Sequence, residues 1–201
     1  FLRNRDIYRR YREILRVLTK NGFGFIVDIL SKGGRVPFHL LRGHDAMEIG
    51  ERISNTLEEL GPTFIKLGQL ISTRADLIPH DILTELSKLQ DEVAPEDFES
   101  IRKVLEEELC SSIEEVFSYF EKTPLASDSI GQVYRARTND GHEVVVKVQR
   151  PQVDKKIHAD VLILKNIARI LNERIVDSPI DFVEVVEELR DSLLNELDYT
   201  K

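Results

Sequence analysis

Cysteine is nearly absent from the sequence, and long apolar runs are missing altogether. The single cysteine, Cys110, cannot form an internal disulfide, which favours the cytosol, the mitochondrial matrix or the plastid stroma over a secreted setting. No apolar run approaches the roughly 20 residues that a membrane-spanning helix needs, and the opening residues FLRNRD do not resemble a signal peptide. The five histidines lack the spacing of zinc ligands, so we expect no metal site among them, and we interpret Cys110 as a small buried residue.

The charge of the chain is distributed unevenly. With 201 residues, 41% of them hydrophobic and 32% charged, the chain is typical of a folded protein, and its net charge is −8. Residues 1–45 contain ten Lys and Arg against four Asp and Glu, so the remainder is strongly acidic. The acidic remainder argues against nucleic acid as the main ligand. The basic leader predicts an anionic surface as a partner at one end of the chain.

Residues 6–20 of this leader have the pattern of an amphipathic helix, with arginines opposite an apolar face. The apolar positions are Ile7, Tyr11, Ile14, Leu15 and Leu18. Two interpretations remain open. Either the helix packs on its own domain, or it lies on an anionic bilayer, where each basic residue adds about 1 kcal/mol of attraction.

Most of the remaining chain also has helical spacing. Asp45 and Glu48 resemble a capping box that begins a helix, and Gly61-Pro62 ends it. Further helices are expected at 63–73, from Pro79, from Pro95, at 153–175 and from Pro179. We therefore expect an α+β chain with a helical part at 1–110 and a second part at 111–201, where strands near 116–150 precede helices near 152–201.

The segment PLASDSIGQVYRARTNDGHEVVVKVQRP at residues 124–151 has the pattern of a β-hairpin. Residues 133–137 and 143–149 alternate as strands do, and Asn139-Asp140-Gly141 between them is a strong signal for a tight turn. Residues 116–122 are expected to form a preceding strand. The pattern predicts an antiparallel sheet.

Lys147 lies inside the second strand of this hairpin, on the face that carries Val145 and Gln149. A lysine in an apolar strand costs free energy unless its charge is paired. One interpretation is an edge-strand lysine that reaches out to water. The other is a lysine that holds nucleotide phosphates, which is how protein kinases use this position.

Four motifs occur in a fixed order around this lysine. KxGQ begins at Lys66, the loop ASDSIGQ stands at 126–132 in place of a GxGxxG loop, VKVQRP surrounds Lys147, and an ExD followed by tyrosine begins at Glu196. Together they resemble the UbiB/ADCK family of atypical protein-kinase-like proteins, which is associated with coenzyme Q biosynthesis. The resemblance covers residues 64–199.

The resemblance implies a helical extension that carries KxGQ, followed by the N-lobe of an atypical protein-kinase-like fold. It implies ATP or ADP with Mg as the cofactor. The residues that it assigns to nucleotide binding are Ala126, Ser127, Asp128, Ser129, Gly131, Val133 and Lys147. Those that it assigns to catalysis are Lys66, Gln69, Glu196 and Asp198. In the family the KxGQ helices cover the place where a protein substrate would dock, so Lys66 is expected to approach Glu196 or Asp198.

The sequence departs from the family pattern in two places. The loop is alanine-rich in the family, whereas Asp128 would place a carboxylate near phosphate, at a cost of roughly 4 kcal/mol at about 4 Å and an effective dielectric near 20. Asp128 points away, meets a metal or a basic group, weakens nucleotide binding, or caps a helix or turn within Ser-Asp-Ser; the sequence leaves these alternatives open. The family's glutamate that pairs with the strand lysine would follow Lys201, and HRD-like and DFG-like motifs are absent. We therefore expect the metal ligands and the C-lobe to lie outside this chain.

The expected function is that of an ATP-binding, atypical kinase-like ATPase that supports isoprenoid-quinone (ubiquinone-like) biosynthesis, of which this fragment alone is inactive. The alternative is a non-catalytic pseudokinase whose helical extension binds lipid or a partner under nucleotide control. Expected partners are a nucleotide, an anionic membrane surface or isoprenoid lipid, and quinone-biosynthesis proteins, but no nucleic acid. The expected location is the cytoplasmic face of a membrane in a prokaryote, or the mitochondrial matrix or plastid in a eukaryote.

Overall fold

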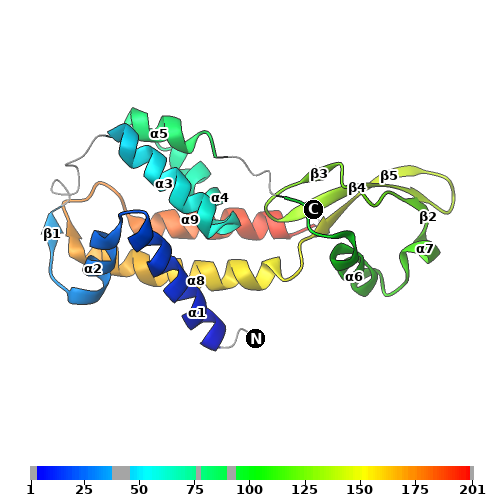
Figure 1. The fold of residues 1–201 in the computed structure, drawn as a ribbon, viewed down its shortest axis with the longest axis horizontal. Helices are drawn as coiled ribbons and strands as arrows, with labels where there is room; N and C mark the ends of the chain where they lie inside the picture. The colour runs from blue at the N-terminus through cyan, green and yellow to red at the C-terminus, as the bar shows by residue number, and fades with distance from the viewer. Residues whose placement is uncertain (1–3, 38–45, 76–77, 90–93, 200–201) are drawn as a thin grey trace. The chain divides into compact units, whose positions relative to one another are not determined.

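The computed structural model describes residues 4–37, 46–75, 78–89 and 94–199. By their internal contacts, residues 1–90 and 155–201 form one compact unit, and residues 91–154 form a second. The first, the helical unit, consists almost entirely of helices, and the second, the sheet unit, contains an antiparallel sheet (Figure 1). The chain is therefore α+β, as the sequence predicts.

The helical unit is built from helices that largely follow the hydrophobic spacing of the sequence. They are α1 (Asn4–Lys20), α2 (Gly24–Lys32), α3 (Ala46–Leu60), α4 (Pro62–Ser72), α5 (His80–Leu86), α8 (Val153–Arg174) and α9 (Phe182–Leu197). Pro62 stands in the first turn of α4, where a missing N–H breaks no helical hydrogen bond. Asp181 caps α9 by accepting from the backbone N–H groups of Val183 and Glu184. None of the described helices has the length and apolar composition needed to cross a bilayer.

Two glycines allow helices of this unit to approach one another closely. A Cβ atom on Gly68 of α4 would lie 2.6 Å from Cδ1 of Leu57 in α3 and closer still to Leu89. A Cβ atom on Gly50 of α3 would lie 3.1 Å from the Cα atom of Ile82 in α5. A larger residue would therefore force the Leu57 and Leu89 side chains, or the backbone of α5, to shift. Because Gly68 is the glycine of KxGQ, this position of the motif serves the packing of α4.

A buried ion pair fixes α1 to the rest of the helical unit. Nε of Arg10 donates to Oδ1 of Asp160 in α8 at 2.6 Å, and a second nitrogen of Arg10 donates to the carbonyl of Leu60 at 2.7 Å. The guanidinium also lies over the ring of Phe64, 5.6 Å from its centroid. Burial lowers the pKa of Arg10, but the hydrogen bonds and negative charges of Asp160 and Glu13 outweigh it, so the pKa lies above its ordinary value.

In its described residues, 94–154, the sheet unit has two helices and four strands. They are α6 (Phe98–Leu109), α7 (Ile113–Val116), β2 (Phe117–Phe120), β3 (Ala126–Ser127), β4 (Gly131–Thr138) and β5 (Glu143–Gln149). β4 is central, because it pairs with β5 along one edge while β2 and β3 share the other edge. All of these pairings are antiparallel. The predicted strands and turn are confirmed, and Gly141 supplies the positive φ of 93° that the turn requires.

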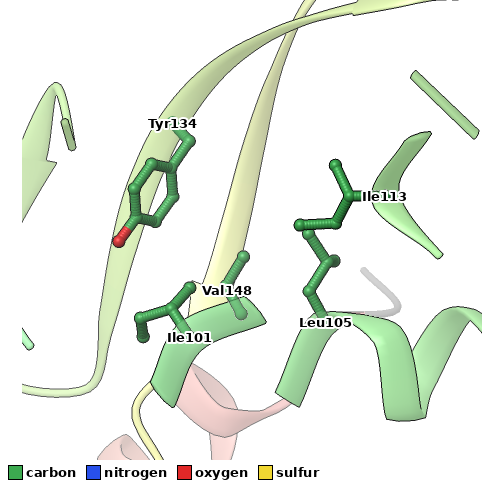
Figure 2. Close-up of a cluster of buried hydrophobic side chains, with 5 residues drawn as sticks. All are labelled: Ile101, Leu105, Ile113, Tyr134 and Val148. Carbon is green, nitrogen blue, oxygen red and sulfur yellow. The ribbon is translucent and has the colours of Figure 1, made fainter. Parts of the chain in front are cut away.

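One face of the β4–β5 hairpin packs against α6. The core cluster comprises Ile101 and Leu105 of α6, Ile113 of α7, Tyr134 of β4 and Val148 of β5 (Figure 2). Tyr134 is 0% exposed, and its ring lies edge-on to that of Phe98. Because strand side chains alternate between faces, this burial places Val133, Val145 and Lys147 on the opposite face.

Two local expectations need correction. The helix expected from Pro95 begins at Phe98, because Asp97 is its N-cap and accepts from the backbone of Ser100. Cys110 is exposed rather than buried, since it ends α6 in a left-handed conformation with φ of 51°.

The remaining expectations concern a strand pair, the cap at Asp45 and the division of the chain into parts. The short parallel pair of β1 (Val36–Pro37) and β6 (Ile175–Val176) has no counterpart among the expected elements. The capping role expected for Asp45 concerns a residue outside the described ranges. Internal contacts group α8, from Lys155 onward, and α9 with the N-terminal helices. The boundary expected at residue 110 instead separates the helices that precede the sheet from the strands and helices that follow.

We expect Asp160→Asn to lower the free energy of unfolding by about 3–5 kcal/mol, because it removes the buried countercharge of the Arg10 guanidinium and leaves only the half-exposed Glu13. Urea denaturation followed by circular dichroism measures the loss. The control is Asp6→Asn, since Asp6 pairs with Arg9 at 3.7 Å where both side chains are largely exposed. That change should cost about 0–1 kcal/mol. Equal losses in the two variants would contradict the role given to Arg10 and Asp160.

Candidate functional site

Lys147 lies on the face of the sheet that points away from the core. It pairs with Val133 across the β4–β5 ladder, and its side chain is 45% exposed. Val145, two residues earlier on the same face, is 69% exposed. The expected sharing of a face by Lys147 and Val145 is confirmed. The face therefore offers an ammonium group beside exposed apolar surface.

Asp128 supplies a countercharge for this lysine and also closes the turn between β3 and β4. Its Oδ1 accepts from the backbone N–H of Ile130 at 2.9 Å and of Gly131 at 2.5 Å. Its Oδ2 lies 3.4 Å from Nζ of Lys147. Two of the alternatives that the sequence left open, a turn cap and a partner for a cation, therefore hold at the same time.

Arg150 holds the turn from behind, a role that the sequence analysis missed. Its side chain donates to the carbonyl of Asp128 and to Oγ of Ser127, each at 2.8 Å, and it pairs with Glu96 at 3.0 Å. Its own backbone N–H donates to the carbonyl of Ile130 at 2.8 Å. The residue is only 8% exposed. The sequence signal for this role was an arginine between a strand and Pro151. The partners of Arg150, however, lie up to 56 residues away along the chain.

Gln132 joins the turn to the core through a buried polar network. Its amide donates to the hydroxyl of Tyr134 at 2.6 Å, and its carbonyl accepts from the backbone N–H of Glu96 at 2.6 Å. Burial raises the pKa of Tyr134 above its ordinary value, although the nearby Arg150 opposes the shift. Both side chains are 0% exposed, so this network rigidifies the base of the loop.

The remaining loop residues expected at the site occupy the β3–β4 hairpin. Ala126 pairs with Val133, and Ser127 pairs with Gln132. Ser129 is buried at the tip of the turn. The structure thus brings every expected loop residue into one hairpin that ends beside Lys147.

The KxGQ helix and the ExD motif meet within the helical unit. Nζ of Lys66 on α4 forms an ion pair with Oε1 of Glu196 on α9, as the resemblance leads one to expect. The two side chains are 23% and 37% exposed. Gln69 donates to the carbonyl of Leu89 at 3.3 Å, so its amide supports the segment after α5. Asp198 lies at the C-terminal end of α9, where it is the C-cap residue.

The chemistry available on the sheet unit is anion binding. Two adjacent backbone N–H groups and an ammonium converge on one carboxylate, and such donor sets also hold phosphate oxygens. Among the described residues, no group of three or more His, Cys, Asp or Glu could hold a metal ion.

A double-mutant cycle of Lys66→Ala with Glu196→Gln should give a coupling free energy of about 0.5–1 kcal/mol, because the residues touch but are partly exposed. Thermal or urea unfolding of the four proteins measures it. Glu184 provides the control, since it lies on α9 three turns before Glu196 and is exposed. Lys66→Ala with Glu184→Gln should be additive within about 0.5 kcal/mol. Additivity in both cycles would show that the pair contributes nothing to the docking of α4 on α9.

Comparisons with known proteins identify relatives of this chain. The chain is 43% identical over 190 residues to a Clostridium pasteurianum protein described as an uncharacterized protein in the hydrogenase 1 5′ region; the match covers 94% of the chain and 34% of that protein. It is 45% identical over 150 residues to the probable protein kinase UbiB of Cellvibrio japonicus, with 74% of the chain and 27% of the relative covered. The corresponding Pseudomonas aeruginosa protein (strain LESB58) is 46% identical over 151 residues, with 74% and 28% covered. The chain thus spans about a third or less of the length of these relatives.

A solved structure is also similar, the complex of Rv3197 with erythromycin from Mycobacterium tuberculosis. It shares 33% sequence identity with a TM-score of 0.46, over 76% of this chain and 40% of that one. The family model of the ABC1 atypical kinase-like domain matches residues 88–201, more than half of the chain. With the sheet lysine, the turn beside it and the Lys66–Glu196 pair in place, the chain belongs to the family of ABC1 atypical kinase-like proteins, with curated relatives named probable protein kinase UbiB.

Proposed function

We propose that the sheet unit binds a nucleotide on the exposed face of β4 and β5. Lys147 is the observation that carries the proposal. Its ammonium lies on the face away from the core, beside a turn whose N–H groups converge on an anion. Kinases use an ammonium on the equivalent strand to hold nucleotide phosphates. Val133 and Val145 would offer the apolar surface against which a base packs.

In this proposal the full-length protein is an atypical kinase-like ATPase that supports isoprenoid-quinone biosynthesis, as the family resemblance implies; its relatives are named probable protein kinase UbiB. ATP with Mg²⁺ would supply the transferable phosphoryl group. Lys147 would hold phosphate oxygens, and the N–H groups of Ile130 and Gly131 would donate to them. The pairing of Lys66 with Glu196 would hold α4 on α9.

A non-catalytic role remains a second candidate, and the Lys66–Glu196 pair favours it. A glutamate of the ExD motif that is held by an ammonium is less available to metal or substrate. ATP hydrolysis by the full-length protein distinguishes the two functions. Turnover of ATP would support the enzyme, whereas nucleotide binding without turnover would support a nucleotide-controlled binding protein.

In the full-length protein, Lys147→Ala should weaken Mg-ATP binding by at least tenfold. Hydrogen bonds to charged groups contribute about 1.5–3 kcal/mol, and about 1.4 kcal/mol corresponds to a factor of ten in affinity. Isothermal titration calorimetry measures the change. Lys103→Ala is the matched control, because Lys103 is an exposed lysine on α6 in the same unit. Unchanged affinity in Lys147→Ala would refute the proposed site.

We also propose that the helical unit meets an anionic membrane surface through α1. Ile14 and Val17 of this helix are 1% and 7% exposed, so its apolar face packs on its own domain. The opposite face presents an exposed stripe of arginines at helical spacing, which are Arg5, Arg9, Arg12 and Arg16. With the apolar face engaged, the attraction would be electrostatic rather than a matter of insertion. This proposal would account for the location at a membrane that the family resemblance implies.

Reversing two of these charges, in Arg9→Glu with Arg12→Glu, should reduce binding to vesicles that contain phosphatidylglycerol by at least tenfold. Each basic residue near such a surface contributes about 1 kcal/mol. Co-sedimentation at low and high salt measures the loss, and salt should abolish the wild-type binding. The control reverses Lys103 and Lys122 of the sheet unit, which are exposed. Equal binding to neutral phosphatidylcholine vesicles would refute the electrostatic interaction.

A further inference from the structure

The carboxylate of Asp128 occupies a set of donors that suits a phosphate group. Its Oδ1 is shared by the N–H groups of Ile130 and Gly131, at 2.9 and 2.5 Å, and its Oδ2 lies 3.4 Å from Nζ of Lys147. Successive backbone N–H groups that point at one anion are a recurrent phosphate site in proteins, and a neighbouring ammonium strengthens it. An anion that belongs to the chain itself is therefore bound where the proposed function needs the anion of a ligand.

The backbone of this turn is held independently of the Asp128 side chain. The N–H of Asp128 donates to the carbonyl of Gly131 at 2.9 Å. The guanidinium of Arg150 donates to the carbonyl of Asp128 and to Oγ of Ser127, each at 2.8 Å. These contacts do not involve the carboxylate. Rotation of the Asp128 side chain would therefore leave the N–H groups of the turn in position to meet another anion.

The carboxylate can also rotate away from these donors. The side chain of Asp128 is 39% exposed, so rotation about χ1 can carry it into solvent without opening the core. The displaced carboxylate would still lie within one side-chain length of the incoming phosphate. Two anions at that separation repel each other strongly unless a cation lies between them.

We propose that Asp128 is a tethered anion that competes with the nucleotide for the turn and Lys147, and that it makes the site select metal-complexed over metal-free polyphosphate. The inference rests on the proposed nucleotide-binding function. A metal-free polyphosphate must displace the carboxylate and then bear its repulsion. With Mg²⁺ bound, the cation offsets that repulsion, because carboxylate and phosphate oxygens are its preferred ligands.

The test compares the full-length wild-type protein with Asp128→Asn. Asparagine keeps a side-chain oxygen that can accept from Ile130 and Gly131 but removes the charge. Isothermal titration calorimetry with inorganic tripolyphosphate in EDTA should show at least fivefold tighter binding by Asp128→Asn. With Mg²⁺ in excess and ATP as the probe, the gain should be smaller.

Asp140→Asn is the matched control. Asp140 is an exposed aspartate in the turn at the other end of the β4–β5 hairpin, so the same charge change should alter either affinity by less than twofold. The melting temperature is a second measurement, which separates competition from structural support. Without ligand, Asp128→Asn should melt at the same or a lower temperature, because it loses the ion pair with Lys147. A purely structural role would lower both stability and affinity.

Equal or weaker binding of metal-free tripolyphosphate by Asp128→Asn, in a protein whose wild type binds Mg-ATP, would overturn this inference and leave the nucleotide site standing. Failure of both wild type and variant to bind either probe would overturn the proposed function, and this inference with it. Tighter binding by the variant that is equally large with and without Mg²⁺ would overturn the selection for the metal complex.

Discussion

The packing of the β4–β5 hairpin on α6 is the constraint from which the geometry of the candidate site follows. Tyr134 and Val148 enter the core with Ile101 and Leu105, and this burial decides the orientation of every other residue in the two strands. A shift of β5 by one residue relative to β4 would move Lys147 to the buried face that carries Tyr134. The free energy of burying the aromatic and aliphatic side chains therefore also holds an ammonium group on the open face.

Two buried arginines fasten segments of the chain through polar contacts that apolar packing alone does not supply. In the helical unit Arg10 joins α1 to the carbonyl of Leu60 and to Asp160. In the sheet unit Arg150 joins the turn at Asp128 to Glu96. The planar guanidinium suits this task, because several donors in fixed directions can satisfy carbonyls and a carboxylate together. Each arginine is stable in its buried position only while those acceptors are present.

The KxGQ motif combines different physical roles within one turn of α4. Glycine fits at position 68 because the side chains of Leu57 and Leu89 occupy the space where a Cβ atom would lie. Gln69 supports the segment after α5 through the Leu89 carbonyl, and Lys66 reaches Glu196 on α9. Two positions of the motif thus shape the surroundings of α4, and the lysine joins this helix to the ExD motif. Part of a motif whose residues suggest catalysis therefore serves to pack α4 against its neighbours.

The sequence by itself determined the features that depend on near neighbours in the chain. The alternation in EVVVKVQ and the Asn-Asp-Gly turn define the hairpin and the face of Lys147, because strand periodicity and positive φ at Gly141 are local properties. Gly22, with its positive φ of 83°, likewise lies in the local break between α1 and α2. Only the tertiary structure decided the partners of the charged residues. Arg10 is one of several similar arginines in a basic helix, and it is buried because Asp160 lies opposite it, 150 residues away. The tertiary structure also decided the role of Asp128, for which the sequence left alternatives open. The distance from its carboxylate to Nζ of Lys147 depends on how two strands and a turn pack together.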